Sequence, residues 1–539
     1  MLRRDRLPRG LRAFMTIKLS STGRKTRSLE EQLNKLRQQE KGEEDNLERE
    51  LSFQPEGAPK KAIGGGTKTL AQRLSQSLRD PLRSKDYCGT VDKGEITIDC
   101  HHHSKVIMFK NRKGYLSPSA MENLTELIQL SDTNWYEKFS ILKGGAEGFC
   151  AGLLPEKAHH ADGRRDLEAQ GMLYRLGWLL ARSKKRRIAM LDGPCLGAGA
   201  AMALNHWNPD AAVAFHRQLG TNGAAGHASN QGGKAVQTNQ RERNSLTDSS
   251  FKSKPVEHIR IGTGRMQLSF QNAHFLGAYP GVGASFYLPR LRGHIGMYLA
   301  LTGARINVED ALYSGAVTHY VQTHRMDKLQ KALTDSDFSI SDDEVMAIVE
   351  DFAVSASELQ LIHQDPHFKA DKHPPSSSYY QRYILQGVPE PTHLEDNIDD
   401  IDRCFGQTTL QGLVQALQAT DSDWGRSTLE RVESMSPTAL KVTFALLRRA
   451  ATCDNLEECV RTEWRLAHRS WPDQREGVRA FEKEKDGKPV WSETLSNEEV
   501  SALFQPIDPA RMSKLNLVQD HLKSTPPSSP SQSMPGVSK

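Results

Sequence analysis

The chain has 539 residues, of which 37% are hydrophobic and 25% charged, a length that allows two or three domains. Its apolar runs are short and broken by charged residues or glycine, far below the roughly 20 residues of a membrane-spanning helix, which argues against an integral membrane protein. Seven scattered cysteines without a CxxC pair exclude a disulfide framework and a zinc ribbon.

The net charge of +5 is concentrated at the N-terminus. Residues 1–27 contain nine Lys or Arg and one acid, interleaved with apolar residues such as Leu7 and Phe14. This pattern predicts a mitochondrial presequence over 1–28, with a disordered basic tail as the alternative. The rest of the chain has a net charge of −3, so we expect no general attraction for a phosphate backbone.

A charged arm and a linker are predicted over 29–93. The first part is helix-prone and charged all round, with too few leucines for a core stripe, which is typical of a solvated helix or a partner-binding arm. The AIGGGTK stretch near Gly64 lacks the GK[ST] ending of a phosphate-binding loop and is interpreted as a linker.

Short strands and helices alternate over 94–336, which predicts an α/β layered domain. Periodicity and capping residues define its first elements. They are a hairpin over 96–109, a helix over 118–130 starting at Ser117-Pro118, a strand over 139–142, a helix through Leu173, Leu176 and Leu180, and a strand over 188–191.

The second half of the chain is predicted to contain irregular segments and helices. Residues 207–256 are rich in Gly, Asn, Gln and Ser, which indicates an insertion looping out of the domain. Residues 337–393 form an ill-defined connector, and 394–506 have helical periodicity. A disordered tail is predicted over 507–539.

Two Gly-rich strand-to-helix turns carry the first candidate chemistry: FCAG at 149–152 and LGAG at 196–199. Such turns expose backbone N–H groups at a helix N-terminus, and two that converge form an oxyanion hole for a developing carbonyl charge. The alternative is that the glycines serve only close packing.

Several motifs together resemble the 3-hydroxyisobutyryl-CoA hydrolases, a branch of the enoyl-CoA hydratase/isomerase (crotonase) superfamily. They are FCAG, DGPCLGAGAA, PGVGASFYLPRLRGHIGMYLALTGAR, SMSPTALKVT, CVRTEWRL and EGVRAF followed by KDGKPVW, in the family's order. The resemblance implies an α/β fold in which a crotonase ββα-spiral core precedes a helical C-terminal region. It also implies hydrolysis of an acyl-CoA thioester in valine catabolism.

The family's acidic residues are missing from the positions that correspond to them here. The catalytic Glu falls on Asn272 or Ala273, the Asp of the FPD turn on Gly281, and a third acidic position on Leu173. Thioester hydrolysis requires a side chain that transfers a proton, and none of these residues has one. His274 is a possible rescue base, although a histidine in an apolar segment is more often structural.

The oxyanion-hole positions are a remnant of the family pattern. Gly152 is kept, but the Gly-Asp that follows it in the family is Leu153-Leu154, and the middle glycine of GGG is Ala198. The methyl group of Ala198 is expected to crowd a ligand that approaches the backbone.

Three other groups were weighed against ordinary structural roles. Cys100-His101-His102-His103 contains metal-ligating residue types but no partner cluster, so no metal site is predicted. Cys150 and Cys195 lie in the two turns and are interpreted as small buried residues. The basic cluster 182–187 is either a solvated helix end or a contact for the phosphates of coenzyme A or RNA.

The sequence therefore predicts a catalytically degraded hydrolase-like protein in the mitochondrial matrix, without a cofactor. Its expected role is structural, with ribosomal small-subunit proteins as partners and limited rRNA contact, because the added segments lack core-forming patterns and the body is mildly acidic. The alternatives are an active 3-hydroxyisobutyryl-CoA hydrolase and a non-catalytic protein that retains coenzyme A binding.

Overall fold

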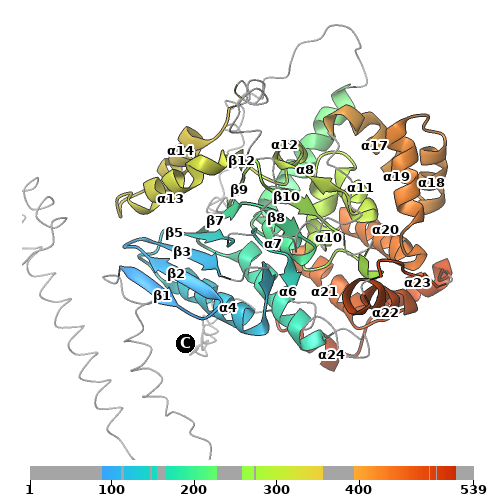
Figure 1. The fold of residues 1–539 in the computed structure, drawn as a ribbon, viewed down its shortest axis with the longest axis horizontal. Coiled ribbons are helices and arrows are strands. Elements are labelled where there is room, and N and C mark those ends of the chain that lie inside the picture. Colours follow the sequence, from blue (N-terminus) through green and yellow to red (C-terminus); the bar gives the residue numbers. More distant parts are fainter. Residues whose placement is uncertain are drawn as a thin grey trace, which may run out of the picture. The chain divides into compact units, whose positions relative to one another are not determined.

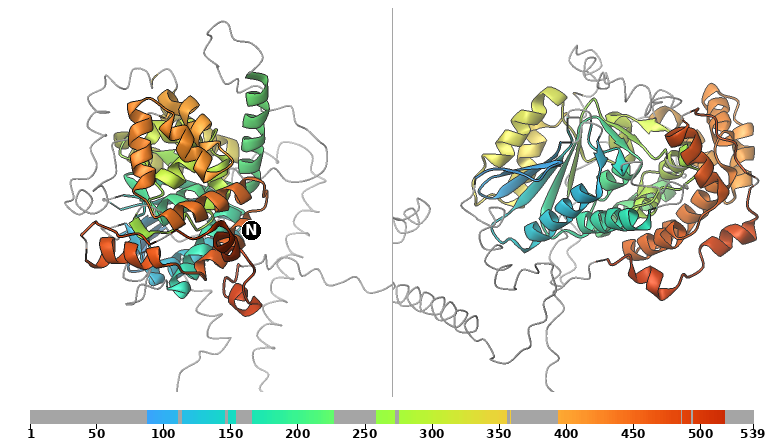
Figure 2. Two further views of the ribbon diagram at one scale, coloured as in Figure 1. Left: turned by 90° about the vertical axis from the view of Figure 1, so that its right-hand side faces the viewer. Right: turned by 60° about the horizontal axis from the view of Figure 1, so that its bottom comes forward.

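The computed structural model describes residues 88–110, 114–145, 148–153, 166–226, 258–271, 275–355, 358, 394–484, 486–492 and 494–517. The predicted presequence (1–28) lies outside these residues, as does all of the arm and linker up to 87. The ribbon is shown in Figures 1 and 2.

A seven-stranded sheet, ordered β1-β2-β3-β5-β7-β9-β12, forms the centre of the α/β part. The strands are β1 (Gly89–Asp92), β2 (Ile96–Cys100), β3 (Ser104–Phe109), β5 (Phe139–Lys143), β7 (Arg186–Leu191), β9 (Ile259–Gly262) and β12 (His319–Tyr320). The first three are antiparallel, which confirms the predicted hairpin, and β3 onward run parallel. Every residue of β7 is buried, as expected for a central strand covered on both faces.

Helices cover both faces of this sheet. On one face lie α4 (Pro118–Thr133) and α6 (Leu167–Arg182), which pack against each other. The Ser117 hydroxyl accepts the Ala120 N–H at 3.1 Å, which confirms the predicted start of α4. On the other face α13 (Met326–Thr334) and α14 (Asp342–Phe352) bury leucines and valines against β5, β7 and β9. Figure 2 shows the sheet between these two helix layers.

Smaller elements surround the two Gly-rich turns. A three-stranded sheet contains β8 (Pro194–Leu196), β10 (Gln267–Ser269) and β11 (Arg305–Ile306), and a two-stranded sheet pairs β4 (Tyr115–Leu116) with β6 (Gly152–Leu153). The short helices are α7 (Ala198–Leu204), α10 (Ala284–Tyr287), α11 (Ile295–Thr302) and α12 (Val308–Ser314), and the longer α8 (Pro209–Gly226) follows α7 in the chain.

The C-terminal region is helical, and it shares one hydrophobic core with the α/β part. Its α-helices are α17 (Ile398–Phe405), α18 (Leu410–Gln418), α19 (Asp423–Glu433), α20 (Pro437–Ala451), α21 (Leu456–Ala467), α22 (Pro472–Gly477), α23 (Asn497–Leu503) and α24 (Pro509–Ser513). Helices α20 and α21 pack on α10, and α17 and α20 pack on α11.

Three segments that the sequence predicts to be irregular contain helices or buried residues in the structure. Helix α8 occupies the beginning of the predicted insertion 207–256, and Trp207 is buried and stacks on Tyr287. Helix α14 lies within the predicted connector 337–393. The predicted disordered tail is packed up to Leu517, because α24 is followed by the buried Leu515. Local composition does not reveal these tertiary contacts.

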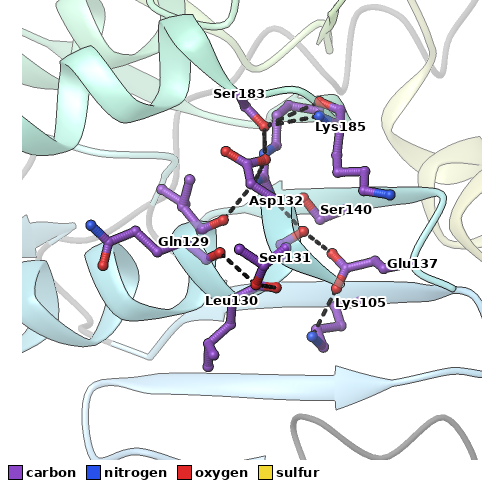
Figure 3. Close-up of polar contacts among 12 residues, drawn as sticks. Lys105, Gln129, Leu130, Ser131, Asp132, Glu137, Ser140, Ser183 and Lys185 are labelled. Atoms are coloured by element: carbon purple, nitrogen blue, oxygen red, sulfur yellow. Dashed lines mark hydrogen bonds and ion pairs between the residues drawn. The ribbon is translucent and has the colours of Figure 1, made fainter. Parts of the chain in front are cut away.

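A network of buried charges joins α4 to the amino ends of the parallel strands (Figure 3). Lys105 on β3 forms an ion pair of 2.8 Å with Glu137, and the Ser131 hydroxyl donates to the same carboxylate. Arg187 on β7 donates to Asp132 at 3.1 Å and to the hydroxyls of Ser183, Ser131 and Ser140 at 2.9, 3.2 and 2.5 Å.

This network buries part of the predicted basic cluster 182–187 and leaves the rest at the surface. Arg187 is only 2% exposed, and Arg186 is also buried and forms an ion pair with Asp342. Arg182 and Lys184 of the cluster are exposed, while Lys185 is half-buried. The cluster is therefore not a continuous phosphate-binding surface.

Candidate functional site

The two Gly-rich turns, which follow β5 and β7, lie against each other. Cys150 and Cys195 form an isolated parallel bridge, and Leu196 N–H donates to the Cys150 carbonyl at 2.9 Å. A Cβ on Gly199 would lie 2.0 Å from the Cys150 oxygen, so only glycine permits this approach. The structure thus brings together the two turns in which the sequence indicates an oxyanion-hole remnant.

Gly152 and Ala198, the two remnant positions, are direct neighbours. A Cβ on Gly152 would lie 3.2 Å from the Ala198 methyl carbon, and the φ of Gly152 is +90°. Ala198 is the first residue of α7, where the backbone N–H has no intrahelical acceptor. The Ala198 methyl group therefore lies where the two turns meet.

The amides of the first turn are already engaged within the chain. Ala151 N–H donates to the Gly114 carbonyl at 2.7 Å, and Gly152 N–H donates to the Cys150 sulfur at 3.3 Å. An oxyanion would have to compete with these bonds, which weakens the preorganisation that such a hole requires.

The thiols in the two turns are not activated. Cys150 and Cys195 are both completely buried, and burial raises the pKa of Cys150 to about 12 and that of Cys195 well above its ordinary value. The thiolate is the reactive form of cysteine. These residues therefore act as small packing residues, as the sequence indicates.

Leu173 and Gly281, two positions where the sequence motifs lead us to expect family acids, lie in closely packed surroundings. Leu173 on α6 is buried in the main hydrophobic core. A Cβ on Gly281 would lie 2.7 Å from the hydroxyl oxygen of Tyr174, the residue after Leu173. Helix α6 contacts α7 and β6, so both positions border the Gly-rich turns.

A buried carboxylate, Glu463 of α21, lies beside this region. Its two oxygens accept the N–H groups of Gly283 at 2.7 Å and Ser285 at 2.9 Å, at the start of α10. The Tyr174 hydroxyl also hydrogen-bonds to this carboxylate. Glu463 therefore joins the C-terminal region to the turn that contains Gly281.

Burial dominates the electrostatics of Glu463. The side chain is completely buried, and this raises its pKa from 4.5 to about 7, although the hydrogen bonds from Ser285, Gly283 and Tyr174 act in the opposite direction. A pKa near neutrality suits a general base. Both oxygens, however, already accept backbone N–H groups, which is the arrangement of a helix cap.

Val282, within the same turn, has an unusual backbone conformation. Its φ is +61°, which is strained for a β-branched residue. The turn is held on both sides, because Asn205 donates to the Val282 carbonyl at 2.8 Å and Gly283 donates to Glu463. Strain of this kind persists only where neighbouring contacts enforce it.

The remaining predicted site residues, Asn272, Ala273 and His274, lie outside the described residues. The described part of the chain contains no group of three or more His, Cys, Asp or Glu side chains arranged to hold a metal ion. Among the same residues, no helix is both long and apolar enough to cross a membrane. In the Cys100–His103 group, His102 Nδ1 lies 3.4 Å from the exposed Cys88 sulfur, and His103 Nε2 lies 2.9 Å from the Ser336 hydroxyl.

Sequence reasoning missed Glu463 as a residue of this site, although its motif CVRTEWRL was recognised. The available signal was its position beside Trp464 on the apolar stripe of Leu456, Val460 and Trp464. An acid on the buried face of a helix needs a partner, and its partner is the α10 N-terminus.

The chain matches the enoyl-CoA hydratase/isomerase family model over residues 256–375 and 358–504. It is 27% identical over 257 residues to a mitochondrial 3-hydroxyisobutyryl-CoA hydrolase of Dictyostelium discoideum, covering 45% of this chain and 59% of that protein. It is 24% identical over 412 residues to small ribosomal subunit protein mS47 of Arabidopsis thaliana, covering 72% and 79%.

Among solved structures, the chain is similar to a carnitinyl-CoA dehydratase from Mycobacterium thermoresistibile. The TM-score is 0.56 at 21% identity, over 77% of this chain and 98% of that one. This likeness establishes the fold alone, and it confirms the α/β crotonase fold expected from the sequence motifs.

Proposed function

Because the chain is a divergent member of the enoyl-CoA hydratase/isomerase family, we propose that it retains a 3-hydroxyisobutyryl-CoA hydrolase scaffold without the acid–base chemistry. In this proposal it is imported into the mitochondrial matrix by residues 1–28. There it serves as a structural component of the ribosomal small subunit.

The observation that carries the proposal is that two positions where the resemblance implies acids have no acid and no room for one. Leu173 is part of the hydrophobic core, and the space a side chain at Gly281 would need is taken by the Tyr174 hydroxyl. Loss of one general acid or base costs on the order of 10²–10⁴ in rate. Loss of two such groups leaves little catalysis, even where the effects do not add.

Glu463 is the specific observation that favours the rival function, an active hydrolase. It lies within hydrogen-bonding reach of Tyr174, and its pKa of about 7 is suitable for a base. A general base must, however, reach the water molecule that it deprotonates. Glu463 has no exposed surface, and both of its oxygens are bonded to backbone amides, which favours a structural role.

The assembly role is supported by the relative named as a ribosomal subunit protein. The match to that protein spans 79% of its length, and a match to a probable 3-hydroxyisobutyryl-CoA hydrolase of Arabidopsis thaliana spans 89% of the hydrolase, so coverage alone does not separate the two functions. The predicted arm and insertion have compositions typical of segments that become ordered on partners. This is consistent with attachment to a larger assembly.

Sedimentation of the tagged chain in a mitochondrial lysate tests this function. We expect the chain to migrate with the small ribosomal subunit, and to stay with it when low Mg²⁺ separates the two subunits. A tagged catalytic 3-hydroxyisobutyryl-CoA hydrolase in the same lysate is the matched control and should remain near the top of the gradient. Recovery of this chain only in those light fractions would contradict the assembly role.

A further inference from the structure

Five basic side chains gather where α6, the end of α21 and α24 meet. We call them the α24 cluster: Arg175, His468, Arg469, Arg511 and Lys514. Arg511 and Lys514 are exposed, and the other three are half-buried. In Figure 1 the ribbon of α24 lies beside α6 and α21, and α24 packs against α21.

Hydrogen bonds to neutral carbonyl groups hold the cluster together. Arg175 donates to the Lys514 carbonyl at 3.4 Å, and Arg469 donates to the carbonyls of Gln505 and Pro506, also at 3.4 Å. The Trp464 indole N–H donates to the Arg511 carbonyl at 3.1 Å. These bonds fix the backbone of α24 without neutralising any of the positive charges.

No carboxylate within the described ranges forms an ion pair with a member of the α24 cluster. Glu168 acts on Arg175 without forming an ion pair with it, and the carboxylate of Asp508, before α24, accepts the Ala510 N–H. Burial lowers the pKa of His468, and Arg511, Lys514 and Arg469 lower it further. The four Arg and Lys charges of the cluster therefore repel one another, while His468 is held in its neutral form, and no described carboxylate is ion-paired with them.

Several other arginines of the same helical region are paired, although the exposed Arg448 and Arg475 form no ion pair with a described carboxylate. Arg461 contacts Glu457 at 2.6 Å, and Arg465 contacts Glu458 at 3.0 Å. Arg426 contacts Asp421 at 2.9 Å, and Arg479 contacts Glu476 at 2.7 Å. The α24 cluster is thus a local concentration of basic side chains in a body that is acidic overall, and no carboxylate of the described residues forms an ion pair with it.

We propose that the α24 cluster binds the phosphate backbone of an RNA. The inference deepens the proposed function, on which it rests, by placing the limited rRNA contact on one face of the molecule. Arginine suits this partner because its planar guanidinium pairs with phosphate in a bidentate manner. Cations that touch only phosphates supply affinity and orientation without reading base sequence.

Salt-dependent RNA binding by the purified full chain tests the proposal. The cluster variant is Arg469→Gln/Arg511→Gln/Lys514→Gln, and the matched control is Arg403→Gln/Arg426→Gln/Arg461→Gln, which removes three ion-paired charges. The probe is a fluorescein-labelled RNA hairpin, measured by anisotropy over a KCl series. Both variants keep the basic N-terminal segment, so its contribution is the same in each.

We expect the cluster variant to bind at least tenfold more weakly than the control in low salt. The slope of log K against log [KCl] should fall by about 2, since each lost phosphate contact contributes roughly 0.7–0.9. Equal affinities and slopes for the two variants would overturn the proposal. If the triple variant does not fold, the double variant Arg511→Gln/Lys514→Gln is measured in the same way. Both side chains are exposed, so their replacement should not disturb folding.

Competitors distinguish RNA from other anions. Polyglutamate and unlabelled RNA are compared as competitors of the labelled hairpin. If polyglutamate displaces the hairpin at the same concentration as RNA does, the cluster binds an acidic protein rather than RNA, and the proposal is overturned. Displacement by coenzyme A at comparable concentration would do the same. If the chain binds RNA through the cluster but never migrates with ribosomal subunits, the ribosomal function fails and the RNA site stands. If it migrates with them but the cluster variant binds normally, only the RNA site fails.

Discussion

The two ends of the parallel strands in the main sheet differ in the charged side chains that lie there. At the amino ends of its parallel strands, Lys105 and Arg187 are buried, and each pairs with a carboxylate. Beyond the carboxyl ends of β5 and β7, where the Gly-rich turns lie, the acidic family positions Leu173 and Gly281 carry no ionisable group. The buried charges Lys105 and Arg187 are thus paired, whereas Leu173 and Gly281 supply no acid at the positions where the resemblance implies one.

In the function we propose, this contrast lets the fold remain stable without the acid–base chemistry. Removing one partner of a buried ion pair leaves an uncompensated charge and destabilises the fold. Replacing a catalytic acid with leucine or glycine costs rate, and it leaves no charge to be buried. The following substitutions test the difference, from the largest expected effect to the smallest.

Substitution Arg187→Met should have the largest effect on stability. It leaves Asp132 without its buried cation and removes the hydrogen bonds to Ser183 and Ser131, so we expect a loss of about 3–5 kcal/mol in the free energy of unfolding. Urea denaturation followed by circular dichroism measures it. Lys184→Met, at an exposed position in the same segment, is the control and should change stability by less than about 0.5 kcal/mol. Similar midpoints for the two variants would refute the structural role of the network.

Glu463 should make stability depend on pH. Its pKa is raised from 4.5 to about 7, so the protonated form is favoured in the folded chain. This stabilisation is complete below pH 4.5 and disappears as pH rises through 7, a change on the order of 3 kcal/mol at 1.36 kcal/mol per pKa unit. Urea midpoints between pH 4.5 and 8 should therefore fall more steeply for the wild type than for Glu463→Gln.

The control for that series is Glu457→Gln, at the beginning of the same helix. Glu457 forms a surface ion pair with Arg461, and its replacement should leave the shape of the wild-type pH profile unchanged. Parallel profiles for the wild type and Glu463→Gln would show that the buried carboxylate is not the titrating group.

Gly281→Asp returns an acid to a family position and should fail to restore hydrolysis. The new Cβ would lie 2.7 Å from the buried Tyr174 hydroxyl, so the change should destabilise the fold by about 1–3 kcal/mol. The double variant Gly281→Asp/Tyr174→Phe removes that oxygen and should recover part of the loss. Thiol release and urea denaturation measure the two effects, and a gain of turnover in the single variant would contradict the interpretation of a filled site.

Ala198→Gly should have the smallest effect. It removes the methyl group where the two turns meet, at the first position of α7, and should cost about 0.5–1 kcal/mol through helix propensity. Ala200→Gly, at a buried position inside the same helix, is the control and should cost at least as much. A marked increase in thiol release by Ala198→Gly would identify the methyl group, rather than the missing acids, as the block to catalysis.

Local sequence patterns predicted the regular elements of the core well. The hairpin over 96–109 and the start of α4 at Ser117 depend on alternation and capping, which neighbouring residues determine. The sequence motifs supplied the superfamily fold, which periodicity alone did not.

Long-range contacts account for what the sequence did not predict. Arg187 was grouped with a solvated cluster because its burial depends on Asp132 and Ser131, which lie over 50 residues away. The order of α24 depends on its packing against α21, and the role of Glu463 depends on Gly283 and Ser285, in another part of the chain. Predicting these contacts requires the tertiary structure.

The most direct test of the central claim is thiol release from 3-hydroxyisobutyryl-CoA by the purified full chain, followed with a thiol reagent. A catalytic hydrolase of the family is the positive control. We expect a rate at least about 10²-fold below that control, the smallest loss expected for one missing acid or base, and unchanged by Glu463→Gln in the folded protein. Turnover comparable with the control, abolished by Glu463→Gln, would contradict the account and make Glu463 the base of a working hydrolase.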